Sequence, residues 1–232
     1  MTDPLRDAAE VMRRVRADCP WSQRITHRDL VPYLIEEAHE VIDAVENGTA
    51  DELREELGDL LWQVLFHAAI AAEVSEYDID DVARGLTEKM VRRHPHVFGD
   101  AVATTPEEVL VHWNAAKAAE KRERRSVLDG VPRGMPALAL AQKLLGRASA
   151  VVPESERPSA GVPVPERAER DEGRSETATG LRVEGPASEA ELGDALLALV
   201  AHARANGWDA ERALRERLRL LEDEVRAAES GA

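Results

Sequence analysis

The sequence predicts an all-α protein, and three features of its 232 residues carry this prediction. Strand signals are nearly absent, whereas apolar residues recur with the 3.6-residue period of helices along most of the chain. Helix-capping motifs precede several of these periodic segments. The hydrophobic content of 44% is sufficient for a core. We therefore expect packed helices, with one polar stretch between them.

The first two helices that the sequence predicts form a hairpin. One runs from about residue 27 to residue 47, with Pro32 near its start and Gly48, a residue suited to a left-handed cap, just past its end. The next opens with a capping box from Thr49 to Glu52 and continues to about residue 73. Because the turn between them is short, we expect the two helices to lie antiparallel.

Two further helices follow the hairpin. One covers about residues 79–93 and ends before Pro95, which cannot continue it in register. The other starts at Thr105, which opens a second capping box with proline in the first helical position, and runs to about Arg122. Four helices with short connections indicate a helical bundle.

A composition change divides the chain. Residues 151–187 hold five of the 12 prolines and four of the 14 glycines, and they include no aromatic side chain. Such a segment cannot bury enough apolar surface to fold, so we expect a disordered linker. It separates a main domain at 1–150 from a shorter helical segment at 188–232.

The charge balance excludes several classes of partner. With 30 Lys and Arg against 45 Asp and Glu, the net charge of −15 repels the phosphates of nucleic acids and anionic membranes. Cys19 is the single cysteine and cannot form an internal disulfide. The first residues lack a secretory signal pattern, and no apolar run approaches the roughly 20 residues of a membrane span. We expect a cytoplasmic protein that binds neither nucleic acid nor membrane.

Four acidic residues flank the apolar seam of the predicted hairpin. Glu37 and Glu40 lie to one side of the apolar stripe on the first helix, and Glu56 and Asp59 take the same offsets on the second. Antiparallel packing brings both pairs to one edge of the seam, with Glu36 beside them. The two stripes consist of Leu34, Ala38, Val41 and Val45 and of Leu53, Leu57, Leu60 and Val64.

Such an acidic cluster favours a bound cation. Like charges held close together raise one another's pKa or recruit a cation, and oxygen ligands alone favour Mg²⁺ or Mn²⁺. A metal held by carboxylates commonly binds phosphate oxygens, which then need further positive charge. Lys89 and Arg93 share one helix face, and Trp113 and Lys117 share another, so that a ring could stack a base beside a phosphate-binding cation.

These segments resemble the MazG family of nucleoside triphosphate pyrophosphohydrolases. The resemblance rests on CPW at 19–21, IEEAHE at 35–40, ELGD at 56–59 and RRHPHVF at 92–98, and it extends over residues 5–147. Family members are α-helical, usually dimeric, and convert an NTP or dNTP and water into the monophosphate and pyrophosphate. A house-cleaning role against non-canonical nucleotides is also implied.

The resemblance assigns roles to the residues singled out above. It implies that Glu37, Glu40, Glu56 and Asp59 bind Mg²⁺ and that Glu36 helps to position metal or water. It further implies nucleotide contacts from Lys89, Arg93, Trp113 and Lys117. One of the glutamates Glu36, Glu37 or Glu40 is expected to act as the base for the attacking water, and the sequence does not choose among them.

The C-terminal segment echoes the second helix of the hairpin. ELGDALLALVAHA at 191–203 repeats ELGDLLWQVLFHA at 56–68, so Glu191 and Asp194 correspond to Glu56 and Asp59. No second Glu-Glu-x-x-Glu helix accompanies it. We therefore expect a remnant helical hairpin that packs its apolar residues and has no catalytic role of its own.

Three other interpretations of the acidic helices compete with the MazG resemblance. Glu36 and His39 have the Glu-x-x-His spacing of di-iron bundles, but the second such motif that these bundles need is missing. Phosphoribosyl-ATP pyrophosphohydrolases carry similar acidic helices and differ in substrate. A non-catalytic acidic helical interaction module is the alternative outside enzymes, and metal dependence separates it from the hydrolase.

Overall fold

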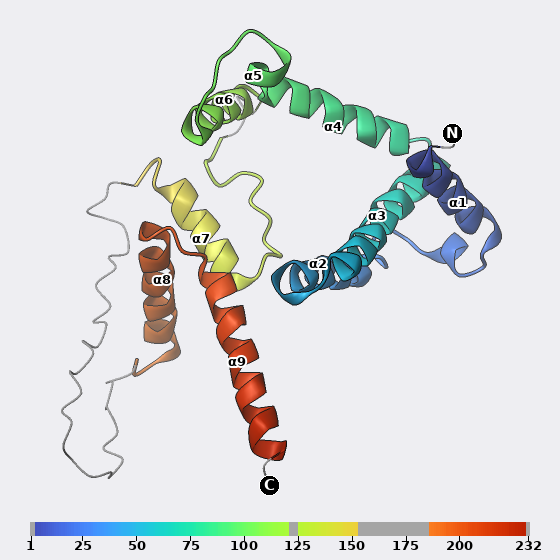
Figure 1. Cartoon of the computed structure of the whole chain (residues 1–232). Helices are drawn as coiled ribbons and strands as arrows, with labels where there is room; N and C mark the ends of the chain where they lie inside the picture. Colours follow the sequence, from blue (N-terminus) through green and yellow to red (C-terminus); the bar gives the residue numbers. More distant parts are fainter. Residues whose placement is uncertain (1–2, 121–124, 153–185, 231–232) are drawn as a thin grey trace, which may run out of the picture. The chain divides into compact units, whose positions relative to one another are not determined.

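The computed structural model describes residues 3–120, 125–152 and 186–230 (Figure 1). All regular secondary structure in these ranges is helical, which confirms the all-α prediction. Contacts divide the chain into two compact units, Met1–Arg122 and Glu123–Ala232. The predicted linker lies, except for its first and last two residues, outside the described ranges.

The first unit contains most of the helices. Its elements are α1 (Pro4–Asp18), the 3₁₀ turn η1 (Ser22–Arg24), α2 (Val31–Asn47), α3 (Ala50–Glu73), α4 (Ile79–Arg93), the short α5 (Pro95–Phe98) and α6 (Pro106–Ala119). α2 and α3 form the predicted hairpin, and α1 packs against α3. α2 begins later than residue 27 because Thr26 and Asp29 form a turn, in which the Thr26 amide and hydroxyl both donate to the Asp29 carboxylate, at 3.0 and 2.7 Å.

The turn between α2 and α3 holds the hairpin in register. Thr49 and Glu52 form the predicted capping box, with the Glu52 amide donating to the Thr49 hydroxyl and the Thr49 amide donating to the Glu52 carboxylate. The left-handed conformation expected for Gly48 is wrong, because its φ is −86° and its ψ is 178°. Glycine is needed for space instead, since a Cβ there would lie 2.8 Å from the Ala44 Cα and carbonyl oxygen.

The core of this unit lies between α1 and the second half of α3. Met12, Leu30, Leu65 and Phe66 form its buried cluster, against which Trp62 packs. The sequence analysis missed α1, although Asp3 caps it by accepting from the Leu5 amide and Pro4 occupies its first turn. The core therefore depends on a helix that lies outside the predicted hairpin.

A buried guanidinium ties α1 to its neighbours. Arg16 is 7% exposed and donates to both oxygens of Glu73 on α3, at 2.5 and 2.8 Å. Its Nη1 also donates to the carbonyl oxygens of Ser22 and Ile25 in the loop that carries η1. One side chain thus joins α1, this loop and the end of α3.

The remaining helices of the unit, α4 to α6, form an arm. α4 leads away from the hairpin and packs against α5 and α6 near its far end (Figure 1). Ile79 at the start of α4 packs against the core, but no residue of α4 is buried. Parts of the predicted apolar stripes are also uncovered within one chain, since Val45 is 64% and Leu57 50% exposed.

The second unit consists of three packed helices in the described ranges. α7 (Ala137–Ala148) packs against both α8 (Glu189–Ala205) and α9 (Ala210–Ser230), and the latter two form the predicted C-terminal hairpin. Gln142 on α7 joins them, because its Nε2 donates to the Trp208 carbonyl at 2.9 Å and its Oε1 accepts from the Ala210 amide at 3.2 Å. None of the described helices has the length and apolar character needed to cross a membrane.

Candidate metal centre

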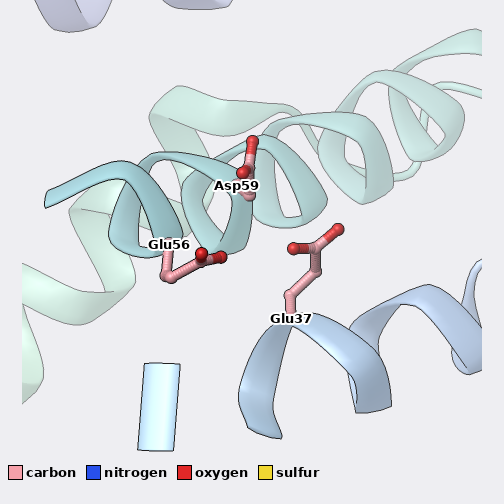
Figure 2. A group of neighbouring side chains, drawn as sticks. All are labelled: Glu37, Glu56 and Asp59. Atoms are coloured by element: carbon pink, nitrogen blue, oxygen red, sulfur yellow. The ribbon is translucent and has the colours of Figure 1, made fainter. Parts of the chain in front are cut away.

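Three of the predicted carboxylates converge between α2 and α3. Glu37 extends from α2 towards Glu56 and Asp59, which lie one turn apart on α3 (Figure 2). One oxygen from each of the three lies within 4.8 Å of those from the other two. Glu37 and Glu56 are half-buried and Asp59 is exposed, so the cluster opens to solvent on one side. The hairpin thus assembles residues that are about 20 positions apart in the sequence.

The electrostatics of this cluster are unfavourable without a cation. Burial raises the pKa of Glu37, and the nearby charges of Asp59, Glu40 and Glu36 raise it further. Burial likewise raises the pKa of Glu56, with additional contributions from Glu40 and Asp59. Glu40 and Glu36 are therefore close enough to act on the cluster, although neither belongs to the group of three converging oxygens.

Sequence analysis missed one residue that supports the cluster. Gln63 is 4% exposed, and its Nε2 donates to Glu37 Oε1 at 3.3 Å. Its position four residues after Asp59 puts it on the same face of α3. That spacing was a usable signal, but an uncharged side chain beside an apolar stripe gives little reason to suspect a site.

The donor set fits a hard divalent cation. All three converging side chains offer carboxylate oxygen, the donor that Mg²⁺ and Mn²⁺ prefer, and a cation would offset the mutual repulsion. Across the part of the chain that the structure describes, no other group of His, Cys, Asp or Glu side chains converges in this way. Glu191 and Asp194 on α8 accordingly lie outside any such group.

The predicted nucleotide-binding residues gather on the arm. The Arg93 guanidinium lies over the Trp113 ring, 4.8 Å from its centroid, and makes an ion pair with Glu120 at 2.5 Å. The hydrogen bond from Arg93 lowers the pKa of Glu120 to about 2. Lys89 lies one turn before Arg93 on α4, and Lys117 one turn after Trp113 on α6. Within one chain, α4 carries this group away from the carboxylates (Figure 1).

Histidines also lie on the arm, in contact with one another and with Trp113. The His94 ring meets the Trp113 ring edge-on, with 5.3 Å between their centroids. His96 stacks with His112 at 6.1 Å, a pair that the sequence spacing did not suggest. His39, in contrast, is exposed on α2 and hydrogen-bonds to the Ile35 carbonyl oxygen, so it takes no part in the carboxylate cluster.

Comparison with known proteins places the chain in a family. Residues 25–98 match the MazG nucleotide pyrophosphohydrolase domain, a range that includes the carboxylate cluster and α4. An uncharacterized 26.1 kDa protein from the blaB 3' region of Streptomyces cacaoi is 48% identical over 227 residues, which are 97% of this chain and 82% of that protein.

Several relatives carry functional names. The nucleoside triphosphate pyrophosphohydrolase of Escherichia coli (strain K12) is 38% identical over 226 residues, which are 94% of this chain and 84% of that protein. The nucleoside triphosphate pyrophosphohydrolase of Mycobacterium tuberculosis is 50% identical over 145 residues, which are 61% of this chain and 44% of that protein. Because the domain match includes the converging carboxylates and the similarity to the first relative spans most of both proteins, the chain belongs to the MazG family of nucleotide pyrophosphohydrolases.

Proposed function

We propose that this protein hydrolyses nucleoside triphosphates between the α- and β-phosphates, with water as the nucleophile and a monophosphate and pyrophosphate as products. The observation that carries this proposal is the convergence of Glu37, Glu56 and Asp59 from two helices, with the pKa values of both glutamates raised by burial and by neighbouring charge. Carboxylates held in this way favour a divalent cation, and such a cation binds phosphate oxygens.

Mg²⁺ is the proposed cofactor, and Mn²⁺ offers the same coordination chemistry. Glu37, Glu56 and Asp59 would hold the ion, with Glu40 as the fourth ligand. When bound, Mg²⁺ offsets the charge of the phosphate oxygens and makes water a better nucleophile at neutral pH. One of Glu36, Glu37 and Glu40 accepts the proton of the attacking water, so no side-chain nucleophile is required.

The cationic group on the arm is the proposed binding site for the rest of the nucleotide. Lys89, Arg93 and Lys117 carry the positive charge that a triphosphate and a departing pyrophosphate need. The Trp113 ring is the proposed surface on which a base stacks. Stacking accepts every base, which is compatible with a role in clearing non-canonical nucleotides.

We propose that the working form is a homodimer. The arm carries the cationic group away from the carboxylates of its own chain, so a second chain is the natural source of the cations for each cluster (Figure 1). Apolar side chains on the hairpin and on α4 support an interface between two chains, since Leu57 and Leu86 are 50% and 53% exposed. Such surfaces favour association with another protein chain.

Product analysis tests the reaction and the site together. Purified protein is incubated with a panel of NTPs and dNTPs, with and without Mg²⁺, beside Glu37→Ala, Glu56→Ala and the control Glu191→Gln on α8. The expected result is monophosphate and pyrophosphate from wild type and control only, and only with metal. If well-folded wild-type protein turns over no nucleotide, the chain is instead an acidic helical interaction module.

Mixing two inactive variants tests the shared site. Glu56→Gln removes a carboxylate and Arg93→Ala removes a cation, so neither variant alone turns over nucleotide. If each site combines two chains, an equal mixture regains about one quarter of wild-type turnover, because half of the dimers are hybrids with one intact site each. A mixture that stays inactive after subunit exchange contradicts the shared site and leaves a site within one chain.

The domain boundaries predicted above stay a proposal. We propose that 1–150 carries the activity and that 188–232 is a remnant of a second module, whereas the linker predicted at 151–187 lies almost entirely outside the described residues. Glu191 and Asp194 on α8 lack a partner helix with the Glu-Glu-x-x-Glu pattern, which supports a packing role for this segment. α7 packs with α8 and α9, so the packing partner of the remnant includes residues 137–148.

A further inference from the structure

Gln63 is a buried polar side chain that reaches from α3 to a residue on α2. Its Nε2 donates to Glu37 Oε1 at 3.3 Å, and the residue is 4% exposed. Its Oε1 is also buried and has no hydrogen-bond partner among the residues that the structure describes. The amide therefore makes one of its possible hydrogen bonds, and that bond goes to the carboxylate cluster.

The place of Gln63 in the helix explains this contact. Glu56, Asp59 and Gln63 follow one another at spacings of three and four residues, so all three lie along one face of α3. That face turns towards α2, where Glu37 is the member of the converging group (Figure 2). Gln63 donates from α3 to the Glu37 carboxylate on α2. This hydrogen bond fixes the orientation of the Glu37 carboxylate relative to Glu56 and Asp59, which are on the same helix as Gln63.

Fold stability alone does not account for an amide at this position. A buried acceptor without a partner destabilises a folded protein, whereas an apolar side chain of similar size leaves no polar atom unpaired. Leu65 and Phe66, close to Gln63 on the same helix, belong to the hydrophobic core. An apolar side chain would therefore be ordinary at position 63. The benefit of the amide therefore lies in the bond that it makes to Glu37.

We propose that Gln63 is a positioning residue of the metal centre, which holds the Glu37 carboxylate turned towards Glu56 and Asp59. This inference rests on the proposed function, because it assumes that these carboxylates bind a divalent cation. Residues that orient metal ligands by hydrogen bonding change metal affinity by about 10- to 100-fold when they are replaced. Gln63 has the geometry of such a residue.

Metal binding without nucleotide tests the role directly. Full-length wild type and Gln63→Met are titrated with Mn²⁺, and free Mn²⁺ is followed by its electron paramagnetic resonance signal. Gln63→Met removes the amide and nearly keeps the volume, so the dissociation constant for Mn²⁺ is expected to rise about 10-fold. Thermal unfolding in EDTA is recorded in parallel, and the midpoint is expected to stay the same or rise.

Three controls give each outcome a meaning. Gln23→Met makes the same replacement at an exposed glutamine of the first unit, whose Nε2 donates to the Ala17 carbonyl, and is expected to leave Mn²⁺ affinity unchanged. Gln63→Leu repeats the test with a differently shaped apolar side chain. Glu56→Gln establishes that the carboxylates bind the Mn²⁺ that is measured.

Two results overturn the role of Gln63 alone. One is wild-type Mn²⁺ affinity in both Gln63 variants, and the other is a lower unfolding midpoint in EDTA for both, which makes Gln63 a structural residue. Wild-type protein that binds no Mn²⁺, or that binds it as tightly as Glu56→Gln does, overturns the proposed metal site as well. The failure of this inference is thereby distinguished from the failure of the proposed function.

Discussion

At the scale of single residues, the carboxylates of the cluster are the clearest case of a charge arrangement that opposes folding. The pKa of Glu37 and that of Glu56 are both raised, chiefly by burial. The native state therefore binds protons more readily than the unfolded state does at these two sites. Their contribution to the free energy of unfolding accordingly falls as the pH rises from the ordinary value of 4.5 through the raised values.

Removing one of these charges should therefore weaken the dependence of stability on pH. Metal-free Glu37→Gln should lose less stability than wild type between pH 4.5, the ordinary pKa of glutamate, and neutral pH, because one repelled charge is absent. Urea unfolding in EDTA at a series of pH values measures the difference. Equal pH dependence in the two proteins would mean that the charges at the cluster do not oppose folding.

In wild type, bound Mg²⁺ should offset the repulsion among these carboxylates and stabilise the native state. At a concentration 100-fold above its dissociation constant, a ligand that binds only the native state adds about 2.7 kcal/mol to the free energy of unfolding. We expect this gain for wild type and its loss in Glu37→Gln and Glu56→Gln. Chemical unfolding at fixed pH with Mg²⁺ or EDTA checks it, and the variant Glu191→Gln in the second unit should respond as wild type does.

The Arg16 guanidinium is a second residue whose environment gives a quantitative expectation. Arg16→Leu removes the partner of Glu73 and leaves the Ser22 and Ile25 carbonyls without this donor, so we expect a loss of about 3 kcal/mol. Glu73→Gln should cost only about 1 kcal/mol, because the glutamine oxygen still accepts a hydrogen bond from Arg16, which also keeps its bonds to two backbone carbonyls. Urea unfolding of both variants measures the ratio, and an equal cost would contradict this account of the pair.

At the scale of elements, the α2–α3 hairpin decides whether the site exists, because it brings carboxylates from two helices together. Its register depends on a turn in which Thr49 caps α3 and Gly48 passes close to the Ala44 backbone. A shift in this turn moves Glu37 relative to Glu56. Stability and metal affinity should therefore change together when the turn is altered.

Gly48→Ala tests this coupling. Its Cβ would lie 2.8 Å from backbone atoms of Ala44, so the turn must shift, with an expected cost of about 1–3 kcal/mol and weaker Mn²⁺ binding. Gly58→Ala within α3 is the matched control, because a Cβ there meets nothing within 4 Å. It should gain up to about 1 kcal/mol, since alanine favours a helix over glycine. Thermal unfolding in EDTA compares the two, and a stable Gly48→Ala would contradict the steric argument.

At the scale of the whole molecule, the chain contains the same acidic motif twice, but the described structure gives only the first a converging partner. Glu56 and Asp59 on α3 meet Glu37 from α2, whereas α8 packs against α7 and α9, neither of which carries the Glu-Glu-x-x-Glu pattern. Glu191 instead accepts a hydrogen bond from the Ala187 amide at 2.7 Å near the start of α8. The repeated motif has a local structural use in the second unit.

Replacing the two copies of the motif in separate variants tests whether only the first copy takes part in activity. The double variant Glu191→Gln with Asp194→Asn should keep wild-type turnover and Mg²⁺ dependence, since glutamine still accepts a capping hydrogen bond. The matched double variant Glu56→Gln with Asp59→Asn should lose at least about 100-fold in turnover, because two proposed metal ligands are gone. Initial rates over a Mg²⁺ titration measure both, and an inactive second-unit variant would show that the repeat still takes part.

Much of this architecture was predictable because local sequence encodes it. The capping boxes that begin at Thr49 and Thr105 locate the starts of α3 and α6 closely, and the proline at 95 ends α4 as expected. The packing of α1 on α3 was not predictable in the same way. Arg16 lies in a charged segment, and only its contact with Glu73, 57 positions away, turns it into a buried part of the core boundary.

Local sequence was enough to predict the all-α class, the hairpin and the acidic residues, because helical periodicity, caps and residue chemistry are local properties. Which acids converge became clear only from the packed helices, as did the support that Gln63 gives to Glu37 and the course of α4 away from the hairpin. The physical reason is that convergence depends on how two helices pack and rotate against each other. That packing is a sum over contacts between residues far apart in the chain, α1 included, and no local pattern contains it.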